Sequence, residues 1–149
     1  MRRTLLTTLL FILVMWNFAG SQTASPGYKV IVNEENPVSE ISVKELSKIF
    51  LKRIRKWDNG EKILPVDLEE SSPARESFSR EVHQKKVSAI KAYWQKQIFT
   101  GRGVPPPEKD SPREVLQYIE EHEGAIGYIP ENVSIENFKV KVIRVKAED

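Results

Sequence analysis

The chain has 149 residues, which is enough for one domain with a substantial apolar core. It contains no cysteine, and this excludes disulfide bonds and a lipid anchor attached through cysteine. Of its 23 basic residues, Arg2 and Arg3 lie at the extreme N-terminus, and the rest equal the 21 acidic residues in number. A chain body with this balanced charge is a poor candidate for binding nucleic acid.

The first 21 residues have the pattern of a secretory signal peptide. Two arginines precede a short apolar run, and residues 19–21 supply the small side chains of a cleavage site. The apolar run is shorter than the ~20 residues that a membrane-spanning helix needs. We therefore expect residues 1–21 to be a cleaved leader and residues 22–149 to be the exported domain. An uncleaved N-terminal anchor is the alternative.

The first part of the expected domain has strand patterns on either side of a helix pattern. Residues 28–32 alternate and predict a strand, followed by a loop over residues 33–39. Ser42 and Glu45 have the spacing of a capping box, which predicts a helix from residue 43 to about residue 51. A second strand is expected at residues 63–68, after the turn at Asn59-Gly60.

The second part contains three helix patterns and two strand patterns. A helix begins near Pro73, carries Phe78 and Val82, and is interrupted at residues 83–86. The expected elements that follow are a helix over residues 87–98 with Trp94 in the core, a loop over 99–107, a helix capped by Ser111 and Glu114, and strands at 125–129 and 138–145. Gly124 and Gly127 are expected to serve a tight turn and close packing. Strands that alternate with helices predict an α/β layer structure with a mixed or mostly parallel sheet.

The loop between the strand at 63–68 and the following helix is the candidate binding site. Ser72 is placed to cap this helix and Pro73 occupies its first turn. The first N–H groups of a helix point at whatever lies in front of them, so such a loop is a potential anion site. We predict that Ser71, Ser72 and Arg75 donate to an oxyanion. The alternative is that Ser72 and Pro73 form an ordinary helix start.

Two other basic features lie outside this loop. The run at residues 52–56 holds two lysines and two arginines beside Trp57. It indicates either a solvated helix end or a surface that docks phosphate or a partner. The Gly101-Arg102-Gly103 segment indicates either a flexible anion-binding loop or an irregular connection before three prolines.

No pattern typical of an enzyme, a metal site or a cofactor site occurs in the sequence. There is no cysteine, no G-x-S-x-G and no H-E-x-x-H, and the two histidines, His83 and His122, are far apart in polar surroundings that favour the surface. We therefore predict a non-enzymatic protein that holds no metal or cofactor.

Two segments of the chain resemble the periplasmic phosphate-binding proteins of ABC importers. Ile49-Phe50 and Trp57-Asp58 match the family's first segment, and Phe78 falls in register in the helix that follows. Downstream, residues 123–128, EGAIGY, resemble the family's Pro-Gly-Ala-Ile-Gly-Tyr segment. The resemblance covers roughly residues 28–129, which amounts to one lobe of a two-lobed protein. It implies an α/β fold that forms a single periplasmic-binding-protein-like lobe of type II, with a mixed sheet and flanking helices.

The resemblance also places the family's phosphate loop at residues 70–74. The loop's serine corresponds to Ser72, its two glycines to Ser71 and Pro73, and its threonine to Ala74. The family's aspartate corresponds to Glu70 and its arginine to Leu68, while Arg75 follows the loop. These exchanges remove an N–H, a hydroxyl and a guanidinium, and Asp67, Glu69 and Glu70 add negative charge nearby.

The function that the resemblance implies is solute binding in the periplasm. The expected ligand is phosphate or a similar oxyanion, the expected process is ABC-type phosphate uptake, and the expected protein partner is an ABC permease or another envelope protein. One lobe alone does not enclose an anion by closing on it. The alternative is therefore a cell-envelope protein-interaction module on the same fold that has lost its ligand.

Overall fold

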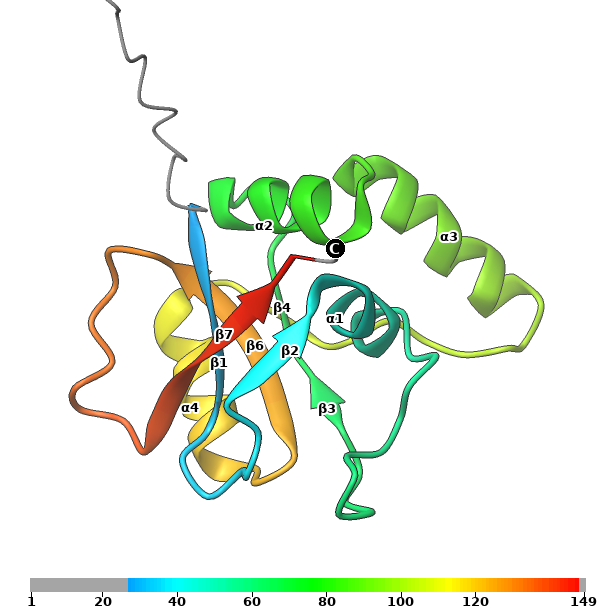
Figure 1. Ribbon diagram of the computed structural model, residues 1–149. Coiled ribbons are helices and arrows are strands. Elements are labelled where there is room, and N and C mark those ends of the chain that lie inside the picture. The colour runs from blue at the N-terminus through cyan, green and yellow to red at the C-terminus, as the bar shows by residue number, and fades with distance from the viewer. Residues whose placement is uncertain (1–26, 148–149) are drawn as a thin grey trace, which may run out of the picture.

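A computed structural model describes residues 27–147, and the expected leader lies outside the described residues. The centre of the domain is a five-stranded sheet with the order β2-β7-β1-β6-β3 (Figure 1). Its strands are β1 (Tyr28–Asn33), β2 (Glu40–Ser42), β3 (Leu64–Pro65), β6 (Ala125–Pro130) and β7 (Val140–Lys146). A separate pair joins β4 (Asp67–Leu68) to β5 (Glu108–Lys109). The helices are α1 (Val43–Phe50), α2 (Pro73–Phe78), the π-helix η1 (Ser79–His83), α3 (Val87–Phe99) and α4 (Pro112–Glu121).

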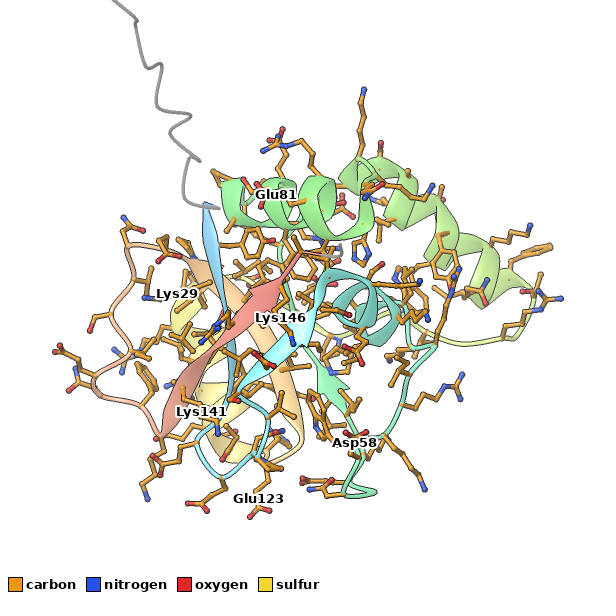
Figure 2. All side chains as sticks on the ribbon, in the orientation of Figure 1. Lys29, Asp58, Glu81, Glu123, Lys141 and Lys146 are labelled. Atoms are coloured by element: carbon orange, nitrogen blue, oxygen red, sulfur yellow. The ribbon has the colours of Figure 1, made fainter. Side chains whose placement is uncertain are left out.

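The sheet is mixed. The central strand β1 pairs antiparallel with β6 and β7, so that Val30 lies between Tyr128 and Ile143. The outer strands β2 and β3 pair parallel with β7 and β6. At the β2 edge Lys146 extends from β7 (Figure 2), and its Nζ lies 2.7 Å from Oε1 of Glu40. The prediction of an α/β fold with a mixed sheet is confirmed, whereas a mostly parallel sheet is wrong because the longest pairings are antiparallel.

Helices cover both faces of the sheet, and two neighbouring residues of β6 show which helix lies on which face. A Cβ at Gly127 would come within 3.0 Å of Val115 and Ile119, so α4 packs closely against that face. The next residue, Tyr128, points to the opposite face. Its ring stacks on Phe78 of α2 at 3.9 Å and lies 5.7 Å from Phe50 of α1. Figure 1 accordingly shows α4 behind the sheet, while α3 extends away from it.

Both predicted capping boxes are present. The Ser42 side chain accepts the N–H of Glu45 at 3.2 Å, and the Glu45 carboxylate accepts the N–H of Ser42 in return. Ser111 and Glu114 make the same reciprocal pair at the start of α4. These bonds satisfy N–H groups that have no partner inside the helix, which explains why both helices begin where the sequence predicts.

The single strand expected at residues 63–68 is wrong, because the chain changes partners at Val66. The N–H groups of Leu64 and Val66 donate to Gly124, just before β6, and to Ile126 within it, whereas those of Asp67 and Glu69 donate to the segment around β5. The sequence also gave no indication of β2 and β5, which are short and pair with segments far away in the chain. The helix through Phe78 is confirmed, but it continues as a π-helix and ends at Gln84, whose φ is 54°.

Within residues 27–147, no helix is both long enough and apolar enough to cross a bilayer.

Candidate functional site

The predicted loop leaves a strand and opens a helix, as the sequence indicates. Its start is fixed by β4, where the N–H of Asp67 donates to Pro107 O at 2.9 Å. Ser72 is the N-cap residue of α2 and Pro73 is its first helical residue. The Ser72 side chain makes no capping bond, so the predicted side-chain cap is wrong. Arg75 occupies the third helical position, so the return bond that a carboxylate or amide would make there is absent as well. The helix start therefore does not use the Ser72 hydroxyl.

Arg75 is buried beneath the loop, with 5% of its surface exposed. Its Nη1 lies 3.1 Å from Oδ1 of Asp67 and donates to the carbonyl oxygen of Leu68 at 2.6 Å. The Tyr128 hydroxyl donates to the same carboxylate oxygen at 2.7 Å. Burial raises the pKa of Asp67 from 3.8 to about 6, although Arg75 and Tyr128 both act to lower it. Arg75 thus ties the start of α2 to β4. That it also contacts an anion stays a prediction.

The acidic residues near the loop are less exposed to an incoming anion than their number in the sequence indicates. Asp67 is enclosed with Arg75, so its charge is compensated inside the protein. Glu70 lies at the surface, and its carboxylate is 2.9 Å from Nζ of Lys91. Of these three acidic residues, only Glu69 is exposed and takes part in no ion pair among residues 27–147. Compensated carboxylates repel an anion less than isolated ones.

The predicted serines line a groove of about 840 Å³ between α2 and the start of α3, which we call the α2–α3 groove. Its charged lining residues are Glu70, Glu76, Arg80, Lys85 and Lys86. The two glutamates face Lys91 and Arg80, respectively. Lys85 and Lys86 form no ion pair among the described residues, and they leave the groove with surplus positive charge.

The two lysines of the groove were missed as site residues. The sequence showed them only as part of the polar stretch that interrupts a helix. In the structure Gln84 turns the chain through a left-handed conformation, and this brings the start of α3 back beside the loop. The structure therefore brings Ser71 and Ser72 together with Lys85 and Lys86, while Arg75 points away from them into the ion pair with Asp67.

The two histidines lie at separate helix ends. Nδ1 of His83 is 2.9 Å from Oγ of Ser47, and Nδ1 of His122 is 2.7 Å from the carbonyl oxygen of Tyr118. His83 is half-buried rather than at the surface, and burial together with Arg75 lowers its pKa to about 4. Among residues 27–147, no cluster of three or more His, Cys, Asp or Glu side chains is arranged to hold a metal ion.

Comparisons with known proteins agree with a single-lobe architecture. The family model described as "PBP superfamily domain" matches residues 21–137. No curated protein sequence matches the chain. Similar folds occur in solved structures of phosphate-binding proteins that are longer than this chain.

Three such structures illustrate the likeness. A phosphate ABC transporter substrate-binding protein of Clostridium perfringens, solved with bound phosphate, aligns with a TM-score of 0.62 and 22% identity over 80% of this chain and 44% of its own. An ABC-type phosphate transport receptor from Vibrio cholerae aligns with a TM-score of 0.62 and 23% identity, over 82% and 47%. PstS from Borrelia burgdorferi aligns with a TM-score of 0.58 and 19% identity, over 80% and 47%.

This chain therefore spans less than half the length of each of these proteins. Because the family model covers most of the sequence, and because the fold matches about half of each structure, the chain belongs to the PBP superfamily and forms one lobe of the phosphate-binding-protein type.

Proposed function

We propose that this domain binds phosphate or a similar oxyanion in the α2–α3 groove and serves ABC-type phosphate uptake without catalysing a reaction. The observation that carries the proposal is the lining of the groove. Ser71 and Ser72 lie there beside Lys85 and Lys86, and the Ser72 hydroxyl is not used by the helix cap. Hydroxyl and ammonium groups are donors that suit phosphate oxygens. The phosphate bound to the C. perfringens relative supports the ligand class.

The open shape of the groove limits the affinity of a single lobe. An anion on an open surface keeps part of its hydration and gains less from each donor than an enclosed one. We expect a dissociation constant on the order of 1 mM for phosphate, which is about −4 kcal/mol. A second protein surface that covers the groove, such as that of a permease or a second copy of the chain, would raise the affinity.

Replacing both serines by alanine tests this site. Ser71→Ala/Ser72→Ala is expected to weaken phosphate binding at least tenfold, because two donors to the anion are lost at roughly 1 kcal/mol each. Chemical-shift titration by NMR measures binding in this weak range, with sulfate as a second ligand. Ser39→Ala, an exposed serine before β2 and outside the groove, is the matched control and should bind as the parent does. If the parent shows no saturable shift up to about 10 mM phosphate, oxyanion binding by the lone domain is ruled out.

Export to the periplasm is part of the proposal and rests on the leader pattern of residues 1–21. Fractionation of cells that express the full chain with a C-terminal tag tests it. The expected product is a shortened protein in the periplasm. Full-length protein in the membrane fraction would support the anchor instead.

A second function, a cell-envelope interaction module, is favoured by two observations. Arg75, the charged residue predicted to hold the anion, is engaged with Asp67 inside the protein. Phe99 is also 93% exposed at the end of α3, next to Ile98, which is 53% exposed, and two adjacent apolar side chains make a surface that suits a protein partner. Affinity capture from periplasm with the purified domain distinguishes the two functions. A stoichiometric partner whose binding is unaffected by phosphate supports the module.

A further inference from the structure

A strongly cationic pocket lies at the other end of α3, and we call it the basic pocket. It has a volume of about 510 Å³ between the segment after α1 and the C-terminal end of α3. Figure 1 shows these two segments on the same side of the molecule. The charged lining residues are Lys52, Arg53, Arg55 and Arg102, and none of the lining residues is acidic.

The basic pocket unites the two basic features for which the sequence leaves two interpretations each. Lys52 and Arg102 are 50 positions apart in the chain, and tertiary contacts bring their segments together. Nζ of Lys52 donates to the carbonyl oxygen of Pro105 at 3.2 Å, and the Tyr93 hydroxyl donates to that of Leu51 at 3.4 Å. The run after α1 therefore forms one wall of a pocket, while Arg53 and Arg55 stay exposed to solvent.

The positive charges of the basic pocket are not compensated by carboxylates. Among residues 27–147, the ion pairs involve Arg75, Arg80, Lys91 and Lys146, and none of the four cations of the pocket. Burial lowers the pKa of Lys52, and the neighbouring cations Lys62 and Arg55 lower it further. Cations gathered without a counter-charge repel one another, and a bound anion removes that repulsion.

The backbone at Lys52 is in a conformation that favours glycine. Its φ is 53°, in the left-handed region that often follows the last turn of a helix. A lysine is strained there, because its Cβ approaches the following carbonyl oxygen. Strain of this kind is concentrated at binding sites, where the side chain is needed in that place. At this position the lysine contributes one of the four cations of the pocket.

The aromatic wall of the basic pocket contains a stacked cation and a buried indole. The guanidinium of Arg53 lies 5.8 Å from the centre of the Tyr93 ring, and this stacking holds the charge in place. Trp94 is 6% exposed, and its Nε1–H has no hydrogen-bond acceptor among the described residues. Buried donors in proteins normally have a partner. This donor is itself closed to solvent, so a ligand oxygen reaches it only if the surrounding side chains move.

We propose that the basic pocket binds a compact, multiply charged oxyanion, with pyrophosphate as the simplest example. Four cations line this concave site. A small ligand with several negative charges complements them better than a single carboxylate does. The site shares no residue with the α2–α3 groove, so it is independent of the proposed phosphate site.

Titration of the exported form of the protein with sodium pyrophosphate tests the proposal, with calorimetry at physiological salt and tryptophan fluorescence as readouts. We expect saturable binding of one ion per chain, and a change in the tryptophan emission, to which Trp94 of the pocket and Trp57 both contribute. Arg53→Gln/Arg102→Gln, which alters two exposed side chains, should weaken this binding at least tenfold. Lys85→Gln/Lys86→Gln removes the same number of charges from the α2–α3 groove and should leave pyrophosphate affinity within twofold. Equal weakening by both variants would reveal a diffuse charge effect and overturn the proposal.

A glycine at the strained position separates binding from folding. Lys52→Gly relieves the strain at this φ but removes the bond from Nζ to the carbonyl oxygen of Pro105, so it should melt close to the parent and should bind pyrophosphate several-fold more weakly. A variant with unchanged affinity would show that Lys52 has no part in a site. Absence of saturable binding to the parent overturns the proposal. If the protein bound oligoglutamate but did not bind pyrophosphate, the proposal would also be overturned, and the pocket would be assigned to an acidic protein partner.

Discussion

Arg75→Met is expected to lower the free energy of unfolding by about 3–5 kcal/mol, the usual loss when one partner of a buried ion pair is removed. Arg75 Nη1 lies 3.1 Å from Oδ1 of Asp67 and donates to the Leu68 carbonyl oxygen. Without the guanidinium, the carboxylate keeps only the Tyr128 hydroxyl as a direct donor in this network. Methionine has a similar length and no charge, so the variant removes the interaction with little loss of volume. Urea unfolding at pH 7.5 measures the difference.

The loss should depend on pH in a defined direction. The folded-state pKa of Asp67 is raised to about 6 from 3.8, so protonation of this carboxyl favours the folded state. Its contribution to stability is complete below about pH 4 and is lost as the pH rises through about 6. Removing Arg75 raises this folded-state pKa further, so the variant continues to lose stability above pH 6, where the parent no longer does. The difference in the free energy of unfolding between the parent and Arg75→Met should therefore increase from pH 4 to pH 8.

A second variant isolates the ion pair from general damage to the core. Asp67→Asn combined with Arg75→Met removes both charges and keeps an oxygen that accepts the Tyr128 hydroxyl. This double variant should be more stable than Arg75→Met alone, because no uncompensated charge stays buried. If the free energy of unfolding of Arg75→Met lay within about 1 kcal/mol of that of the parent, the buried ion pair would be contradicted. Titration of Arg75→Met with phosphate tests the predicted contact of Arg75 with the anion. Lost binding by the folded variant would make Arg75 a ligand, and unchanged binding would restrict the site to the lining of the α2–α3 groove.

The parts of the fold that the sequence predicted correctly depend on local patterns. The boxes at Ser42 and Ser111 each involve two residues three positions apart, so short-range spacing was sufficient. The long strands β1, β6 and β7 have enough residues to show alternation or a continuous apolar run. The direction of their pairing is not a local property, and for that reason the sheet was left open between mixed and mostly parallel.

The parts that the sequence did not predict depend on residues far apart in the chain. The strands β2 and β5 have three and two residues, too few to give a pattern, and they exist only because β7 and β4 lie beside them. The same holds for the candidate sites. Ser71 and Ser72 were found from their position before a helix, whereas Lys85 and Lys86 reach them through the turn at Gln84. The role of Arg75 required its distance to Asp67.

Gly124→Ala is expected to cost about 3 kcal/mol, near the upper end for overpacking, because the added Cβ would overlap the carbonyl oxygen of Lys62. The sequence predicted a tight turn and close packing here, and the close approach is confirmed. Gly124 does not have a positive φ, so its role is the absence of a side chain rather than an unusual backbone conformation. The obstacle is backbone, which cannot rotate away as a flexible side chain can.

The backbone around Gly124 has little freedom to move. Its carbonyl oxygen accepts the N–H of Leu64 at 3.0 Å and Nε1–H of Trp57 at 3.1 Å, so a shift that relieves the overlap breaks two buried bonds. Thermal unfolding and urea titration measure the loss of stability. Gly103→Ala is the matched control, since a Cβ there meets nothing within 4 Å, and it should change stability by less than about 0.5 kcal/mol. Equal stability of the two variants would show that β3 and the start of β6 separate without cost. In that case the parallel pairing of β3 with β6 would not be what positions the loop at Ser71 and Ser72.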